Sequence, residues 1–428
     1  MKETLKELRR MAGMFKARLP ELGLSQVEDR RRRQGRRWPL PTLLRSVIVG
    51  MAAGLGSLAQ LEALTLNMAP SLRKLLGIAR RLPDTTLRDA LVRVKPFELR
   101  RAIHRMICAA HRRKALPLQA FPFHVVALDG KGTSVPAWDH HYAQQRTYDD
   151  GRKADGLVRT VTAALVSTPA KPIIDAVPVP AETNEMGIFP VVFEALLRAY
   201  GNLFRLVTYD AGATSHDNCR LVVEAGKEFL FRIKAETWLV MQEAKRLLGS
   251  IPIELAKAHT EDVLANHTSV HRYLFTCAVL GKTFFGWPQV KTILRVRSET
   301  VKNGQLVSHE DRYYICSLKL TELRLPQWLS LVRHHWAVEN NCHWTLDAIF
   351  KEDEQPWIEA DPRGVVVAML LRRIAYNLLA LFRSVSLKSE AKRAMPWRQL
   401  LRWVYDTLIA STRLDVAGLR TRSAAVFS

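Results

Sequence analysis

Two apolar segments of this chain each end on an aspartate, and this pattern constrains the fold more than any other. Val125–Leu128 precedes Asp129, and Leu206–Tyr209 precedes Asp210. Short runs of this kind predict β-strands, so each carboxylate is expected at a strand terminus. A third acid, Glu339, lies in a segment rich in helix formers. Two strand aspartates and one helix glutamate can converge on a pair of magnesium ions, which suits metal-dependent chemistry at a phosphodiester.

The composition limits the classes of partner. A chain of 428 residues with 48% apolar side chains has enough apolar material for two or three folded domains. Lysine and arginine outnumber aspartate and glutamate by 64 to 41, so the formal net charge is +23. A polyanion, foremost nucleic acid, is therefore the expected partner.

The cysteines and the apolar runs bear on the compartment. The five cysteines are scattered and form no CxxC pair, which indicates a reducing compartment, and we expect the cytoplasm. The N-terminal segment shows no secretory signal, and no apolar run looks long enough to cross a bilayer. No membrane partner is expected.

The N-terminal part combines a cluster of arginines with helical periodicity. The cluster lies directly before Trp38 and consists of Arg30, Arg31, Arg32, Arg33, Arg36 and Arg37. From Thr42 to about Arg113 the apolar residues recur at helical spacing. Residues 1–120 are therefore predicted to form a basic arm and an all-α domain. The arginines are candidates for DNA contacts, although solvated helix faces account for most charges of this kind.

Residues 121–236 change to an α/β pattern. Strands are predicted at 123–128, 157–167 and 171–179, then a helix at 184–200, a strand at 203–209, a helix at 215–225 and a strand at 228–234. This order predicts a mixed sheet with flanking helices. It agrees with a ribonuclease H-like arrangement, in which the first strand, the fourth strand and a later helix each carry one acid.

The remaining sequence divides into three parts. Residues 237–325 are predicted to form a mostly β insertion, with a helix at 239–248 and strands at 270–280, 283–285, 291–296 and 312–317. Residues 326–385 hold the helix that bears Glu339, predicted from Pro326 to Phe350, and the end of the catalytic domain. Residues 386–428 are predicted to form a C-terminal helical tail.

Four polar residues share one face of the predicted 326–350 helix. His335, Glu339, His343 and Asp347 follow one another at i, i+4 positions. This stripe allows two interpretations. In one, all four residues hold zinc or iron; in the other, only Glu339 binds a metal and its neighbours position substrate or support it. The HExxH pattern of zinc hydrolases is absent, which favours the second interpretation.

The segment from Arg333 to Asp353 resembles the R-x-H-W-x-[IV]-E-N-x-x-H-W-x-L-D-x-x-F-x-E-D block of bacterial insertion-sequence transposases of the DDE type. The H-repeat-associated branch is the most similar group. The resemblance continues in Leu128–Lys131, Thr183–Glu185 and Tyr209–Ala211, and it covers most of the chain. The chain departs from the branch at Glu182, where relatives often have lysine, but it keeps the three acids.

The resemblance implies a ribonuclease H-like catalytic domain in which Asp129, Asp210 and Glu339 bind Mg²⁺, with Mn²⁺ as a substitute. It implies a DNA transposase that cuts the ends of an insertion sequence and joins the 3′ hydroxyls to target DNA by two-metal phosphoryl transfer. The implied partner is double-stranded DNA, both terminal inverted repeats and target, bound by a dimer in a synaptic complex.

Further residues are candidates for DNA contacts, and two alternative functions stay open. Lys131, near Asp129, and Arg333 and His335, near Glu339, are candidates for contacts with DNA. For Arg333 and Lys131, surface salt bridges are an equally open alternative. One alternative function is a metal-dependent nuclease that never joins ends, and the other is a catalytically silent DNA-binding protein derived from a transposase.

Overall fold

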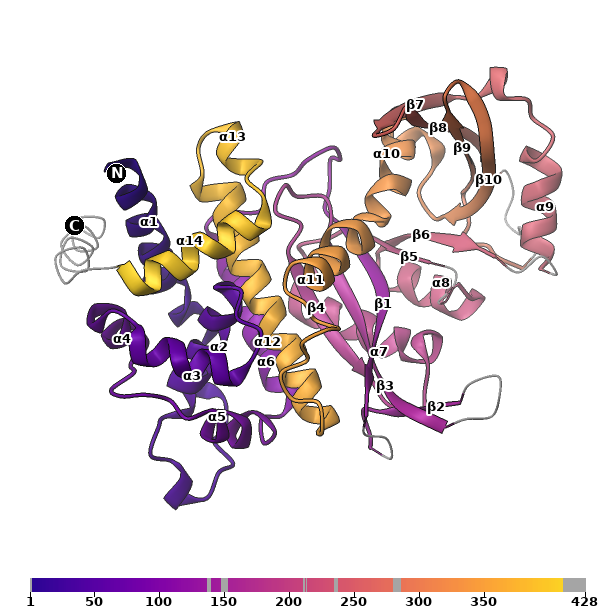
Figure 1. Ribbon diagram of the computed structural model, residues 1–428. Helices are drawn as coiled ribbons and strands as arrows, with labels where there is room; N and C mark the ends of the chain where they lie inside the picture. The colour runs from indigo at the N-terminus through magenta and orange to yellow at the C-terminus, as the bar shows by residue number, and fades with distance from the viewer. Residues whose placement is uncertain are drawn as a thin grey trace.

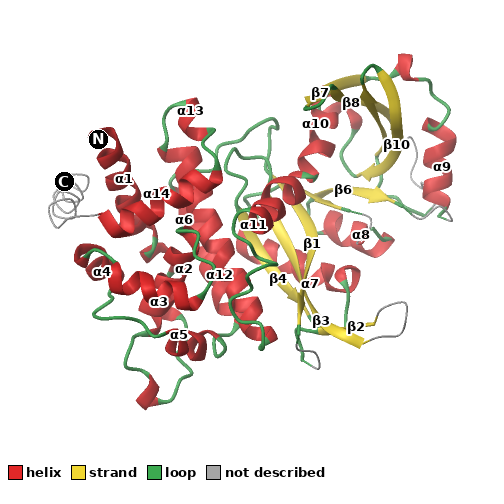
Figure 2. Cartoon of the chain, in the orientation of Figure 1, coloured by secondary structure: helices red, strands yellow, loops and turns green. Residues whose placement is uncertain are grey.

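The computed structural model describes residues 2–136, 140–147, 153–210, 212, 214–234, 238–279 and 286–410. Helices gather at one side of the molecule, a mixed sheet with helices on its faces lies in the middle, and a β-rich extension lies at the other side (Figure 1). Figure 2 shows the same division by secondary structure.

The central sheet has the ribonuclease H-like order that the sequence predicts. Its strands are β1 (Val125–Val135), β3 (Lys153–Leu165), β4 (Ile173–Val179), β5 (Leu206–Tyr209) and β6 (Glu228–Ile233). They lie in the order β4-β3-β1-β5-β6, with β4, β3 and β1 antiparallel and β1, β5 and β6 parallel. Helix α7 (Glu185–Tyr200) connects β4 to β5, and α8 (His216–Glu224) connects β5 to β6. The predicted fold class is confirmed.

Strand β1 is longer than the sequence indicates. We expected it to end near Leu128, but it continues to Val135 because its antiparallel pairing with β3 extends to that residue. The segment after Leu128 is polar and glycine-containing, so it carries no apolar strand signal, and the neighbouring β3 stabilises it. Asp129 therefore lies within a strand and not at its end. A short strand that we did not predict, β2 (Gln144–Thr147), pairs with the start of β3.

The β-rich insertion continues the central sheet. It consists of α9 (Leu239–Leu248), β7 (Ala258–Leu264), β8 (Thr268–Ala278), β9 (Thr292–Lys302) and β10 (Gln305–Cys316). Its last strand, β10, pairs antiparallel with β6, so one sheet runs from β2 to β7. The sequence missed β7 because its residues are mostly polar and exposed. The strand predicted at 283–285 lies outside the described residues.

The helical region is built from both ends of the chain. Its N-terminal helices are α1 (Lys2–Arg18), α2 (Leu40–Ala52), α3 (Leu58–Asn67), α4 (Pro70–Leu76), α5 (Asp84–Leu91) and α6 (Pro96–Arg112). Its C-terminal helices are α12 (Pro362–Leu381), α13 (Glu390–Arg393) and α14 (Trp397–Ala410). Helix α12 packs on α2 and α6, and α1 packs on α14. The two ends of the sequence thus share one hydrophobic core.

Within the described residues, one helix is long and apolar enough to cross a membrane. It covers Pro362–Ser386, and 94% of its apolar window is buried inside the protein. The sequence analysis identified no apolar run of this length. The arginines Arg372 and Arg373 are themselves buried, so this is the central helix of the folded core.

The two buried arginines of α12 surround a buried glutamate. Glu352 is fully buried, and its Oε2 lies 2.9 Å from Nη1 of Arg373 and 3.5 Å from Nη1 of Arg372. Arg373 also donates to the carbonyl of Met369, and Arg372 to that of Gln355. This cluster joins the end of the Glu339-bearing segment to the core of the molecule.

Glu352→Gln is expected to destabilise the protein by roughly 3–5 kcal/mol, because it leaves two buried guanidinium groups without their counter-charge. Denaturant unfolding followed by circular dichroism measures the change. The control is Glu354→Gln, which removes an exposed carboxylate paired with Lys351 and should change the midpoint little. Equal midpoints for the two variants would contradict the role given to the buried cluster.

Candidate active site

Asp129 and Asp210 lie side by side where two parallel strands stop pairing. Leu128 and Tyr209 form the last aligned pair of β1 and β5, and the two aspartates are the next residue on each chain. Neighbouring strands lie about 4.8 Å apart, and residues at the same register position point to the same face. The structure therefore brings the two predicted strand acids together.

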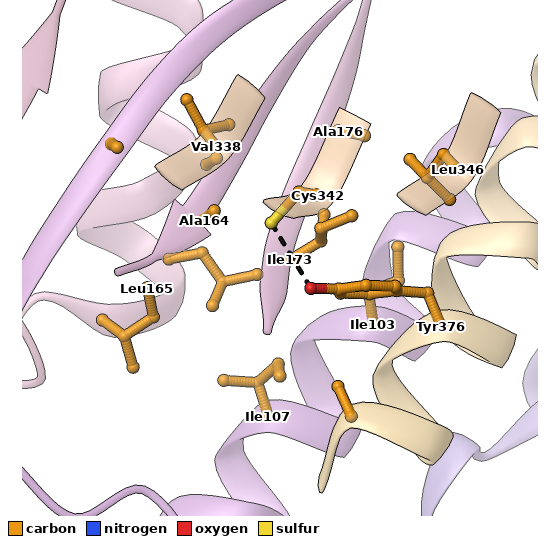
Figure 3. Close-up of a cluster of buried hydrophobic side chains, with 14 of the residues drawn as sticks. Ile103, Ile107, Ala164, Leu165, Ile173, Ala176, Val338, Cys342, Leu346 and Tyr376 are labelled. Atoms are coloured by element: carbon orange, nitrogen blue, oxygen red, sulfur yellow. Dashed lines mark hydrogen bonds between the residues drawn. The ribbon is translucent and has the colours of Figure 1, made fainter. Parts of the chain in front are cut away.

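The segment that carries Glu339 is not the single regular helix that we predicted. Helix α10 (Leu325–His335) is followed by a π-helical segment, Val338–His343, and by α11 (Trp344–Ala348). Figure 3 shows its inner side, where Val338, Cys342 and Leu346 point toward buried side chains of the sheet and of α6 and α12. The π-helical stretch widens the turn at Glu339, and such irregularities often occur at functional sites. Sequence periodicity does not distinguish it from an α-helix.

The polar stripe on the same segment faces strands β1 and β5. His335 is buried, and its Nδ1 lies 3.0 Å from Oγ1 of Thr208 on β5. Farther along, Nδ1 of His343 lies 3.2 Å from Oδ2 of Asp129 on β1. Glu339 lies between these two histidines in the stripe. Its position along the helix is therefore set from both sides, by one contact near each aspartate.

Glu339 itself is exposed and opens toward a cavity. In the described part of the chain its carboxylate makes no hydrogen bond or ion pair. The cavity has a volume of about 440 Å³ and lies between this segment and the insertion. Its lining includes Arg272, Arg312, Arg333 and Trp336. Glu339 thus borders a space that contains several positive side chains.

Basic side chains contact the two aspartates. Nζ of Lys234 lies 3.1 Å from Oδ2 of Asp210, and Nη1 of Arg232 lies 3.5 Å from Oδ1 of Asp210. Asp129 has His343 as its partner. These contacts come from β6 and from the Glu339-bearing segment, and the sequence analysis had assigned none of them. Lys234 is one residue past the end of β6, the neighbour of β5, so its closeness to Asp210 follows only from the strand order.

The carboxylate oxygens of this region fit a magnesium ion by chemistry. Hard oxygen donors are the ligands that Mg²⁺ prefers, and two adjacent aspartates leave room for several water ligands. Among the described residues, no three His, Cys, Asp or Glu side chains already surround one point. Asp210 pairs instead with Lys234 and Arg232, whose positive charge an ion would replace, and Asp129 contacts His343.

The arrangement also bears on the alternative metal site made of all four stripe residues. His335 contacts Thr208, and Asp347 accepts from the ammonium group of Lys131 at 2.6 Å. The members of the stripe thus have separate partners on the sheet. This favours the interpretation in which the neighbours of Glu339 support the site.

The residues proposed beside the acids for DNA contact have protein partners. Lys131 is buried and lies between Asp347 and Asp353. His335 is buried as well, so neither side chain faces a surface where a phosphate could approach. Arg333 is exposed, but both contacts of its Nη2 are with Asp262 of the insertion.

The arginine cluster is partly structural and partly exposed. Arg31 is buried and donates to Asp29 and to the carbonyls of Gly35 and Trp38. Arg30 pairs with Glu28 and with Glu98 of α6. The exposed members of the cluster are Arg32, Arg33, Arg36 and Arg37.

Burial lowers the pKa of His335 to about 4, although Asp129 and Asp210 act in the opposite direction. In the unfolded chain this histidine takes up its proton near pH 6.5. Its contribution to stability is therefore complete above pH 6.5 and is lost as the pH falls toward 4. Between pH 7 and pH 4, wild type should lose roughly 3 kcal/mol more unfolding free energy than His335→Gln. Denaturant unfolding at several pH values tests this, and parallel curves for the two proteins would contradict it.

Comparison with known proteins agrees with these observations. Residues 122–378, more than half of the chain, match the family model described as "Transposase DDE domain". Two Escherichia coli (strain K12) proteins, "H repeat-associated putative transposase YhhI" and "Putative protein YbfL", are each 24% identical over 241 residues, 54% of this chain. The matched region spans 57% of the length of each relative. A solved structure, "Cryo-EM structure of piggyBac transposase synaptic complex with hairpin DNA (SNHP)", is 12% identical with a TM-score of 0.44, over 98% of this chain and 79% of that one. From the match to the family model, the chain belongs to the DDE transposase family.

Proposed function

We propose that this protein is the transposase of an insertion sequence. It cuts the ends of the element and joins the 3′ hydroxyls to target DNA, and Mg²⁺ bound by Asp129, Asp210 and Glu339 is required, with Mn²⁺ as a substitute. It acts on double-stranded DNA as a dimer that holds two element ends, in the cytoplasm. The membership of the DDE transposase family and the H-repeat relatives support this proposal.

The observation that carries the proposal is the position of Asp129 and Asp210, each directly after the last aligned pair of β1 and β5. The segment that bears Glu339 packs against both strands, because His335 contacts Thr208, two residues before Asp210, and His343 contacts Asp129 directly. A divalent ion held here would activate an attacking oxygen and stabilise a leaving one at a phosphodiester.

The protein side chains have distinct roles in this proposal. The two aspartates bind on the sheet side, and Glu339 approaches from the cavity side. His343 positions Asp129, and the neutral His335 holds the helix to Thr208. Arg272 and Arg312 line the cavity beside Glu339 and attract the phosphate backbone. Both arginines already pair with carboxylates, Asp262 and Glu310, so DNA would enter by exchanging these partners.

Asp210→Asn is expected to lower Mg²⁺-dependent strand cleavage by at least about 100-fold, because the substitution removes a ligand to the ion. A labelled duplex that carries the element's terminal repeat measures the cleavage. The control is Asp217→Asn on α8, an exposed aspartate paired with Arg220, which should cleave like wild type. Cleavage by Asp210→Asn at the wild-type rate would exclude the proposed site.

The same assay separates the two enzymatic alternatives. A target plasmid is added, and joined product is separated from cleaved ends on a gel. Joined product is expected for a transposase, whereas a nuclease gives only cleaved ends. Binding without Mg²⁺-dependent cleavage would favour the silent DNA-binding protein.

The exposed arginines of the N-terminal cluster are the proposed contacts with DNA outside the catalytic centre. Arg32 and Arg33 are suited to a test, because both are exposed and neither side chain has a partner among the described residues. Arg36, by contrast, donates to the carbonyls of Arg31 and Asp29 and so has a structural role.

The double variant Arg32→Gln/Arg33→Gln should bind DNA more weakly, to a similar extent for every sequence. The slope of log K against log salt concentration should fall in magnitude by up to about two, since two phosphate contacts are lost. The control Arg93→Gln/Arg198→Gln changes the net charge equally at two surface ion pairs. Fluorescence anisotropy at several salt concentrations measures both. Equal slopes for the two double variants would mean that the cluster acts only through the overall charge.

A further inference from the structure

A fourth carboxylate lies beside the two strand aspartates. Glu185 is the first residue of α7, and the helix is capped separately by Asn184, whose Oδ1 accepts from the backbone N–H of Gly187 at 2.9 Å. The Glu185 carboxylate lies directly over Gly130, so that a Cβ on this glycine would overlap it. A Cβ on Gly212 would lie 3.9 Å from Oε2 of Glu185.

The two glycines locate this carboxylate relative to the aspartates. Gly130 follows Asp129, and Gly212 comes two residues after Asp210, just beyond the last aligned pair of β1 and β5. Successive residues of a strand point to opposite faces, so Glu185 reaches Gly130 from the α7 face while His343 reaches Asp129 from the other. Because Gly130 and Gly212 have no side chains, the carboxylate is open to the two aspartates at the edge where β1 and β5 separate.

The position is electrostatically unfavourable in the absence of a cation. Burial raises the pKa of Glu185, and the charge of Asp129 raises it further, followed by that of Asp210, while Arg159 lowers it. Among the described residues the carboxylate accepts no hydrogen bond that would compensate. A glutamate that served only the helix dipole would gain the same benefit while pointing into solvent.

A buried hydroxyl gives a second, independent indication of a ligand. Tyr209 is 2% exposed, and its hydroxyl has no hydrogen-bond partner among the described residues. Its ring packs against that of Phe189 on α7, with the ring centroids 6.0 Å apart, so Tyr209 lies on the same face of the sheet as the helix that carries Glu185. A buried hydroxyl without a partner costs free energy. An ion with its bound water would supply the missing partner.

We propose that Glu185 is a ligand of the divalent metal, completing the sheet side of the site with Asp129 and Asp210. The three carboxylates come from β1, from the residue after β5 and from the first residue of α7. This set binds the ion in the absence of DNA, before Glu339 takes part. The proposal deepens the function proposed above and rests on its metal site.

The test is Mn²⁺ binding to the full-length protein without DNA, measured by electron paramagnetic resonance and calorimetry. Glu185→Gln is expected to weaken Mn²⁺ binding by at least about tenfold, as is Asp129→Asn. The matched control is Glu194→Gln on the same helix, an exposed carboxylate paired with Arg198, which should bind like wild type. Wild-type affinity in Glu185→Gln together with weakened binding in Asp129→Asn would overturn the proposal for Glu185 and leave the proposed function intact. Wild-type affinity in both variants would overturn the metal site itself.

Thermal unfolding in EDTA distinguishes the loss of a metal ligand from a folding defect. Because Glu185→Gln removes a like charge, it should melt at or above the wild-type temperature in EDTA, and Mn²⁺ should raise its melting temperature less than it does that of wild type. A lower melting temperature in EDTA would contradict the close approach of like charges around Gly130. An equal rise on adding Mn²⁺ would contradict Glu185 as a ligand.

Discussion

The buried ammonium group of Lys131 holds together the two parts of the candidate site. Its Nζ lies 2.6 Å from Oδ1 of Asp347 and 3.1 Å from Oδ2 of Asp353, and Thr133 donates a hydrogen bond to Asp353. Lys131 and Thr133 belong to β1, and both aspartates belong to the segment that follows Glu339. A charge-assisted contact is strong in a region of low water content and has a defined geometry. The distance between Asp129 and Glu339 therefore depends on a protein contact that exists without DNA.

Much of the chain's positive charge is used in the same way, inside the protein. Arg100 binds the fully buried Asp175 of β4 with two hydrogen bonds, and Arg295 binds Asp311 while its other donors reach backbone carbonyls of the insertion. The net charge of +23 still favours a polyanionic partner. It does not identify the contact residues, because arginine serves as both an internal link and a surface charge.

The sequence was most informative where a pattern has one structural meaning. Apolar runs before Asp129 and Asp210 predicted neighbouring strands, and the order of strands and helices predicted the sheet. Features that depend on contacts with other segments of the chain, or that leave the apolar spacing unchanged, could not be predicted in this way. The extension of β1 depends on β3, the burial of Lys131 depends on two aspartates over 200 residues away in sequence, and the π-helical segment has the same apolar spacing as an α-helix. Glu185 stood out in sequence only as part of the Thr183–Glu185 motif, and its closeness to Gly130 comes from the fold.

The shared core of the helical region has a consequence for how the chain is made. Helices α1 to α6 leave the ribosome first, but α12, which packs on α2 and α6, follows only after the whole sheet and its insertion. Until residue 381 has been translated, apolar faces of the first helices stay uncovered and available to chaperones or to other nascent chains. A reading frame that stops within the sheet would thus give an unfinished, aggregation-prone product. The N-terminal helices and the exposed arginines would therefore not fold as a separate domain.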